Sequence, residues 1–135
     1  MLDFNNEIFT AVAVRVRDQF TGATVTGEYT RKPSKFPCVT LDEVENVTVD
    51  SLVDSSDTEN FARISYRLQV FSNKRNGKKA EARAIFALAD SVMLGMGFRR
   101  KTYTSTPEIY ESTIYSITAT YEAVVDVNGV IYQSR

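Results

Sequence analysis

The strongest constraint on the fold is an alternation of apolar and polar side chains in residues 112–127. The apolar members of the alternation are Tyr115, Ile117, Ala119, Tyr121, Ala123 and Val125, and Ser, Thr and Glu stand between most of them. A period of two places the two sets on opposite faces of an extended chain. The pattern therefore predicts a long strand with one face in a core and the other in water.

Residues 61–71 repeat the alternation, with Ala62, Ile64, Tyr66, Leu68 and Val70 on one side. We expect the other face, which includes Arg63, Arg67 and Gln69, to be exposed. Residues 98–106 predict a further strand, separated from the 112–127 strand by a turn at Pro107 and Glu108. The pair Asn128-Gly129 is typical of a type I′ turn, so residues 130–133 should fold back on the end of the 112–127 strand.

Two segments have the spacing of amphipathic helices. In residues 3–20, apolar side chains recur every four positions, Asp3 is placed as an N-cap, and Thr21-Gly22 ends the helix. In residues 78–96 the apolar positions fall at the helical spacing, and Gly95 and Gly97 end the segment.

The remaining segments are shorter or more polar. Residues 23–30 predict a strand, 31–37 a proline-containing loop, and 38–41 a short strand. The acid-rich stretch 42–60 predicts a long, solvated loop, in which residues 47–49 are a candidate short strand. Together these elements predict a single α+β domain over residues 1–135. It would have one antiparallel sheet, two helices packed on one face and a small C-terminal hairpin.

The composition argues against several kinds of chemistry. The chain of 135 residues has no His and one Cys, so the commonest general base and the commonest zinc ligand are missing. We expect Cys38 to be a buried structural thiol, and the composition makes a poor case for catalysis. We expect no metal site. The acidic stretch lacks the Gly and the regular ligand spacing of a calcium loop. The N-terminus does not have the pattern of a signal peptide, and no apolar run predicts a membrane span, so we expect a soluble protein folded in the cytoplasm.

Charge is segregated along the chain although it sums to −1. Residues 1–60 carry a net charge of −6, and residues 61–135 carry +5. A solvated surface explains this distribution most simply. The alternative is that unlike patches meet on neighbouring copies of the chain. The candidate interface residues are the acids Asp42, Glu43 and Glu45 and the bases Lys74, Arg75, Lys78, Lys79, Arg99 and Arg100, together with Arg63, Arg67 and Gln69.

The basic residues also allow a different function. Residues 74–79 and 99–101 form two basic clusters, with Tyr103, Tyr110, Tyr115, Tyr121 and Tyr132 near them in sequence. Aromatic side chains beside a cationic groove are typical of single-strand nucleic-acid binding. A small nucleic-acid-binding module is therefore the alternative function, although Tyr115 and Tyr121 belong to the apolar face and are more simply core residues.

The order of elements and several small motifs resemble the tail terminator and head-to-tail joining (tail completion) proteins of long-tailed bacteriophages. Four features carry the resemblance. The first two are the N-terminal helix ending near Gly22 and the Pro-flanked strand 36–41. The third is the strand 66–71, which leads through Asn73 and Lys78 into a helix that closes with 93–100, and the fourth is the terminal strand and hairpin at 121–126 and 129–132. The resemblance covers essentially the whole chain.

The resemblance implies a structural virion protein that forms a ring, usually a hexamer. The ring would terminate the tail tube or join it to the head connector. The expected partners are other copies of this chain, the tail tube protein and the connector or neck proteins. The expected location is the neck end of the virion tail, after assembly in the cytoplasm of the bacterial host. The resemblance implies no enzyme activity and no cofactor, and it implies contact with nucleic acid only as DNA passes through the ring. The near-zero net charge gives no reason to expect a membrane partner.

Overall fold

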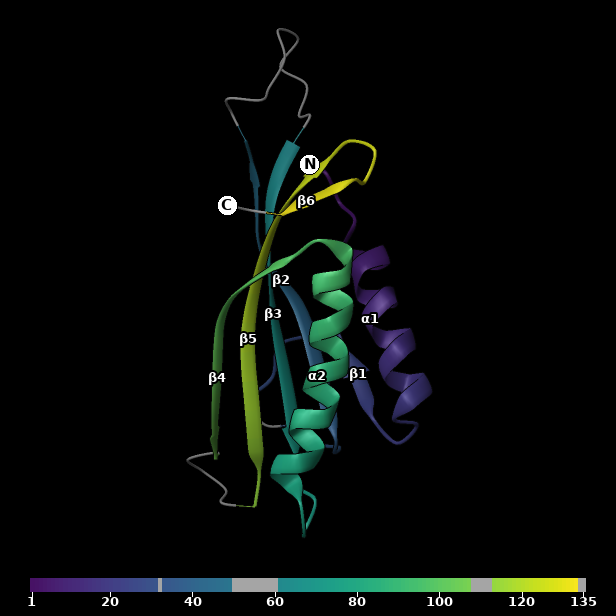
Figure 1. Ribbon diagram of the computed structural model, residues 1–135, viewed down its shortest axis with the longest axis vertical. Helices are drawn as coiled ribbons and strands as arrows, with labels where there is room; N and C mark the ends of the chain where they lie inside the picture. The colour runs from purple at the N-terminus through teal and green to yellow at the C-terminus, as the bar shows by residue number, and fades with distance from the viewer. Residues whose placement is uncertain (32, 50–60, 108–112, 134–135) are drawn as a thin grey trace, which may run out of the picture.

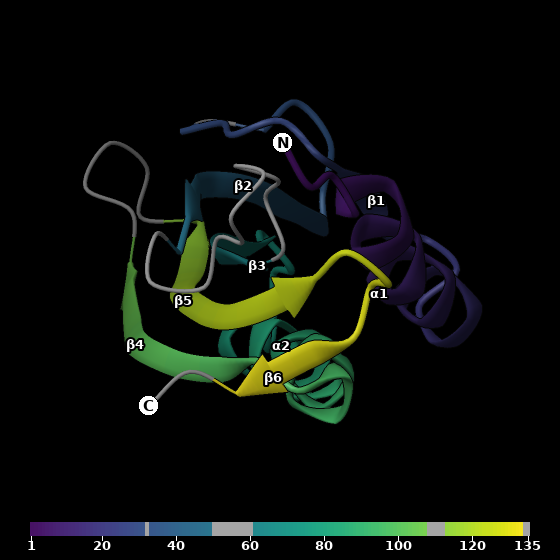
Figure 2. The same cartoon turned by 90° about the horizontal axis from the view of Figure 1, so that it is seen from above.

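The computed structural model describes residues 1–31, 33–49, 61–107 and 113–133 (Figure 1). The elements in chain order are α1 (Asn5–Gln19), β1 (Thr24–Thr26), β2 (Cys38–Thr48), β3 (Phe61–Ser72), α2 (Lys78–Met96), β4 (Arg99–Pro107), β5 (Tyr115–Asp126) and β6 (Ile131–Gln133). The α+β prediction is confirmed. Both helices lie on the same face of the sheet, and the view from above shows the sheet curling around α2 (Figure 2).

The sheet has the strand order β1-β2-β3-β5-β4, and β6 pairs with β5. Neighbouring strands in this order are antiparallel except β1 and β2, which are parallel over three residue pairs. The prediction of a wholly antiparallel sheet is therefore wrong at this edge. The reason is that the chain between them, described at residues 27–31 and 33–37, does not form a tight turn, so β1 and β2 point the same way.

The core lies between the helices and the inner face of the sheet. The predicted inward set of β5 is buried, as is the inward set of β3, and the two predicted helix stripes face them. Tyr66 on β3 packs edge-on against Phe98, with ring centroids 5.6 Å apart. Because the alternating apolar sets are directed at the helices, the periodicity predictions for both strands and both helices are confirmed.

The helix ends follow the sequence in part. Phe4, and not Asp3, is the N-cap of α1, and no side chain caps this helix; Asp3 instead accepts a hydrogen bond from the backbone N–H of Asn5. Gly97 closes α2 with φ of +108°, and the N–H groups of Gly97 and Phe98 donate to carbonyls of the last turn. Gly95 lies inside the helix, so Gly97 alone provides the left-handed residue that ends it.

The largest correction concerns the acidic stretch. The sequence predicts a loop over residues 42–60 with a candidate short strand at 47–49, but residues 42–48 all continue β2 as one strand to Thr48. The candidate strand is therefore confirmed at residues 47 and 48, and the loop prediction is wrong for 42–46. Residues 42–48 pair with residues 62–67 of β3 through a bulge between Glu43 and Glu45. Acidic residues have a low strand propensity. Backbone hydrogen bonds to β3 and side-chain partners on β3 stabilise this part of the strand. Residues 50–60 of the predicted loop lie outside the described residues.

The C-terminal hairpin forms, but its turn differs from the prediction. The N–H of Gly129 donates to the carbonyl of Asp126, and the N–H of Asp126 donates to the carbonyl of Val130. These bonds enclose a three-residue loop with Gly129 at φ of +81°, whereas a type I′ turn would have Asn128 and Gly129 as its two central residues. A Cβ on Gly129 would stand 3.2 Å from the ring of Phe4, so the turn also packs closely on the start of α1.

Candidate interaction surfaces

The outer face of the sheet, which faces away from the helices, carries an ion pair between β2 and β3. Arg67 on β3 donates to both carboxylate oxygens of Asp42 on β2, with Nη2 to Oδ2 at 2.7 Å and Nε to Oδ1 at 3.3 Å. Its guanidinium also lies 3.9 Å from the ring centroid of Tyr29, in the segment between β1 and β2. The ring and the carboxylate restrain the Arg67 side chain, so this residue ties the β1–β2 segment to the sheet.

The three β3 side chains expected on an exposed face differ in their surroundings. Arg63 is exposed and lies 3.7 Å from Glu122 on β5, and Arg67 is half-buried. Gln69 is only 7% exposed, so its expected exposure is wrong. The hydroxyl of Thr40 donates to its amide oxygen at 2.8 Å.

Gln69 is buried because this end of the outer face is not open to water. Beside it, Cys38, Phe71 and Ile114 form a second, smaller apolar cluster, with Phe36 packed against it. The alternation along β3 places Gln69 on the correct face, but it carries no information about what covers that face.

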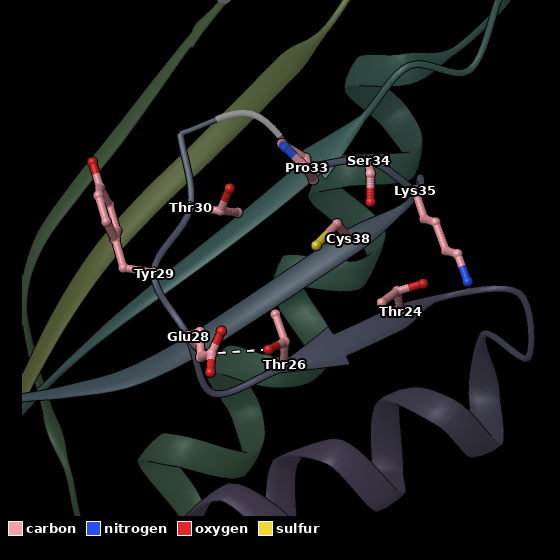
Figure 3. A pocket seen from close by; sticks show the side chains of 9 residues that line it. All are labelled: Thr24, Thr26, Glu28, Tyr29, Thr30, Pro33, Ser34, Lys35 and Cys38. Atoms are coloured by element: carbon pink, nitrogen blue, oxygen red, sulfur yellow. Dashed lines mark hydrogen bonds between the residues drawn. The ribbon is translucent and has the colours of Figure 1, made fainter.

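The segment between β1 and β2 encloses a shallow cavity of about 310 Å³ with Cys38 on its wall (Figure 3). Hydroxyl side chains dominate the lining, and one carboxylate and one amine are present: Thr24, Thr26, Glu28, Tyr29, Thr30, Pro33, Ser34, Lys35 and Cys38. Cys38 is buried, as expected, and burial raises the pKa of its thiol. A thiol with a raised pKa is a poor nucleophile, so Cys38 is better suited to packing than to catalysis.

The predicted acids on β2 are divided between internal and external contacts. Asp42 is held by Arg67, and a carboxylate oxygen of Glu43 accepts a hydrogen bond from the buried Tyr66 hydroxyl at 3.2 Å. Burial first, and then the charge of Glu43, raises the pKa of Tyr66. Glu45 is exposed. Of the three acids, Glu45 is therefore the one most available to a partner.

The two predicted basic clusters lie at opposite ends of α2. Lys74, Arg75, Lys78 and Lys79 surround its first turn, whereas Arg99 and Arg100 follow its last turn. A helix of 19 residues separates them by about 28 Å. Tyr115 and Tyr121 are buried in the core, so they offer no stacking surface. Of these residues, the structure brings Arg100 and Tyr103 together in one groove, described below, and it separates the two basic clusters. Tyr110 lies outside the described residues.

A network that the sequence did not indicate joins α2 to the sheet. Asp90 accepts a hydrogen bond from the buried Tyr121 hydroxyl at 2.6 Å and from Arg100 at 2.9 Å. Burial, together with the bond to Asp90, raises the pKa of Tyr121. The contact could not be read from spacing, because Asp90 and Tyr121 stand 31 residues apart in sequence.

Beside this network, α2 and β4 form the walls of a groove. Its cavity of about 310 Å³ is lined by Arg83, Phe86, Ala87 and Asp90 from α2 and by Arg100 and Tyr103 from β4. The rings of Phe86 and Tyr103 meet edge to face at 5.1 Å. The α2–β4 groove, as we call it, thus combines aromatic surface with two arginines, of which Arg100 is paired with Asp90.

No protein-family model matches the chain, and no curated protein matches it at a significant level. In the described ranges, no three His, Cys, Asp or Glu side chains are grouped to hold a metal ion. No helix in those ranges is long and apolar enough to cross a membrane.

Proposed function

We propose that this chain is a structural virion protein that assembles head to tail into a ring, usually a hexamer, at the head-proximal end of a phage tail. The ring terminates the tail tube or joins it to the head connector. Its partners are other copies of the chain, the tail tube protein and the neck proteins. The proposal combines the resemblance in element order with the surfaces described above.

The observation that carries the proposal is the distribution of charge across the sheet. Glu43 and Glu45 lie on β2, next to the β1 edge, whereas Arg83, Arg99 and Arg100 lie on α2 and β4 at the opposite edge. Part of the charge segregation of the sequence thus lies on two opposite sides of one domain, while Asp42 and Arg67 pair within it. Unlike surfaces on opposite sides favour a heterologous contact, and heterologous contacts close into rings when the rotation between copies permits it.

The outer face of the sheet has the properties of a surface along which DNA passes without binding tightly. Arg67 and Arg63 are each accompanied by a carboxylate, Asp42 and Glu122 respectively. The hydroxyls of Thr102 and Thr120 are hydrogen bonded to each other at 2.7 Å between β4 and β5. Tight binding to nucleic acid needs cations that are free to neutralise phosphates, and the paired arginines are not free in this way.

The test is to add the purified chain to polymerised tail tube protein from the same phage and to image the tubes by electron microscopy. We expect a ring of this chain at one end of each tube and no further tube growth at that end. Binding along the whole tube wall, or no binding to tubes, would contradict the proposal. Binding to single-stranded nucleic acid in place of tubes would support the alternative module.

A further inference from the structure

The strand β4 presents a free edge. It is the last strand in the sheet order, and the described strands pair only with its β5 side. A bulge interrupts the pairing between Arg100 and Thr102, and Pro107 ends the strand, so the regular part of the edge is residues 102–105. In an antiparallel strand, alternate residues direct both the N–H and the C=O away from the paired neighbour. Two of these four residues can therefore bond a further strand.

The register of β4 shows which of its side chains face the helices. Tyr103 stands opposite Ala119 and Ser105 stands opposite Ile117, and both partners are fully buried on the inner face of the sheet. A strand added at the edge keeps the alternation of the sheet. Its residues beside Tyr103 and Ser105 would therefore point to the helix side, and the residue between them would point to the outer face.

The α2–β4 groove lies over these same positions on the helix side. α2 contacts β4 at two points, where Phe86 meets Tyr103 and where Asp90 bonds Arg100. The two pairs show that α2 and β4 run in opposite directions. Arg83 lines the groove one helical turn before Phe86, so it lies toward the C-terminal end of β4.

The charges of the groove are only partly balanced. Each carboxylate oxygen of Asp90 accepts a hydrogen bond, one from Arg100 and one from Tyr121. Arg83 is exposed and has no carboxylate partner among the residues that the structure describes. Tyr103 is 42% exposed, so part of its ring is open to a ligand. The groove thus offers one position for an apolar side chain and, a helical turn away, one for a carboxylate.

We infer that the β4 edge and the α2–β4 groove bind an extended acidic peptide segment of a partner protein by strand addition. Main-chain bonds along an edge give affinity in this mode, and alternate side chains give selectivity. An antiparallel segment reaches Ser105 before Tyr103, so its motif is a carboxylate, any residue, and then an apolar residue. The exposed Arg99 and Lys101 beside the edge favour further acids in the segment. The inference goes beyond the proposed function, because it assigns a peptide motif that does not depend on where the chain assembles.

A peptide titration followed by NMR tests the motif. The probe is acetyl-Thr-Thr-Glu-Thr-Val-Thr-Thr-amide, added to the isotope-labelled full chain up to millimolar concentration. We expect the amide resonances of residues 102–105 and the side-chain resonances of Arg83 and Tyr103 to shift. The same peptide with Lys in place of Glu should bind about tenfold more weakly, because repulsion from Arg83 replaces attraction. Equal binding of the two peptides, or no shift at β4, would overturn the inference.

A charge-reversed variant tests the role of Arg83. Arg83→Glu should invert the preference, so that the Lys peptide binds more tightly than the Glu peptide. The matched control, Arg75→Glu, makes the same change in the exposed turn before α2 and should keep the wild-type preference. Circular dichroism establishes that both variants are folded. An unchanged preference in Arg83→Glu would contradict the assignment of the carboxylate to the groove.

Two N-methylated peptides test whether the segment binds as a strand. Every second N–H of an added strand is directed to β4, and the others are directed to solvent. Methylation of the valine amide nitrogen and methylation of the preceding threonine amide nitrogen, in separate peptides, should therefore differ. One should abolish binding and the other should be tolerated. Equal effects of the two methyl groups would refute strand addition.

Amide hydrogen exchange distinguishes a partner segment from a second copy of this chain. The outward amides within residues 102–105 should exchange quickly in the free protein and become protected when the Glu peptide is added. Protection without peptide would mean that another copy already covers the edge, and it would overturn the assignment to a partner. The proposed function is tested separately on tail tubes, so a ring at the tube end without peptide binding would refute this inference alone.

Discussion

The Asp90 network gives a prediction whose magnitude follows from the contacts. Tyr121 is fully buried, and its hydroxyl donates to Asp90, which also pairs with the half-exposed Arg100. Replacing Asp90 by Ala leaves the Tyr121 hydroxyl without its partner, which costs about 1–3 kcal/mol. Loss of the partly exposed ion pair between Asp90 and Arg100 adds only about 0–1 kcal/mol to this cost. We therefore expect Asp90→Ala to lower the free energy of unfolding by about 1–4 kcal/mol.

The matched variant removes the hydroxyl instead of its partner. Tyr121→Phe should cost about 1–2 kcal/mol, because it deletes a hydrogen bond to a charged group and leaves Asp90 paired with Arg100. The double variant should cost less than the sum of the two, since no buried hydroxyl is then left unpaired. Urea unfolding of the four proteins measures the coupling energy, which we expect to be about 1–2 kcal/mol. Additive effects would refute the claim that Asp90 stabilises the fold through Tyr121.

Three further predictions concern stability. Folding raises the pKa values of Tyr66 and Tyr121, so the folded state favours their neutral forms. Their contribution to the free energy of unfolding is complete below about pH 10, the pKa of an unfolded tyrosine, and is lost as the pH rises above it. Alkaline unfolding should therefore shift to higher pH in the Phe variant of either residue. Phe86→Ala should cost about 3–5 kcal/mol in urea unfolding, and an unchanged midpoint would contradict its burial. Arg67→Glu should lower the thermal midpoint because it places a second carboxylate beside Asp42, whereas Arg67→Met should lower it less.

Periodicity predicted those elements whose environment is set by a single large core. Ala119 and Tyr121 are buried because their face of β5 meets α2, and the same core fixes the apolar stripes of both helices. Gly97 was predictable as a helix end because only a residue tolerant of positive φ fits there. These features depend on local sequence and on one buried face.

The features that sequence patterns missed depend on contacts between distant segments. Residues 42–48 form a strand because β3 supplies Arg67 and Tyr66 as partners for acids that by themselves favour a loop. Gln69 is buried by a cluster on the face that alternation assigns to water. The α2–β4 groove follows from the position of β4 beside α2, which spacing does not encode. Candidate interface residues were identifiable as charged, but their pairing was not.

The central claim is that several copies of this chain form a closed ring at one end of a phage tail. Quantitative mass spectrometry of purified tails, with the tape-measure protein as internal standard and labelled antibody to locate the chain, tests it most directly. The account predicts the small, fixed copy number of a ring, usually a hexamer, confined to the head-proximal end. A single copy per tail, a distribution along the tube, or recovery of the chain only with nucleic acid would contradict it.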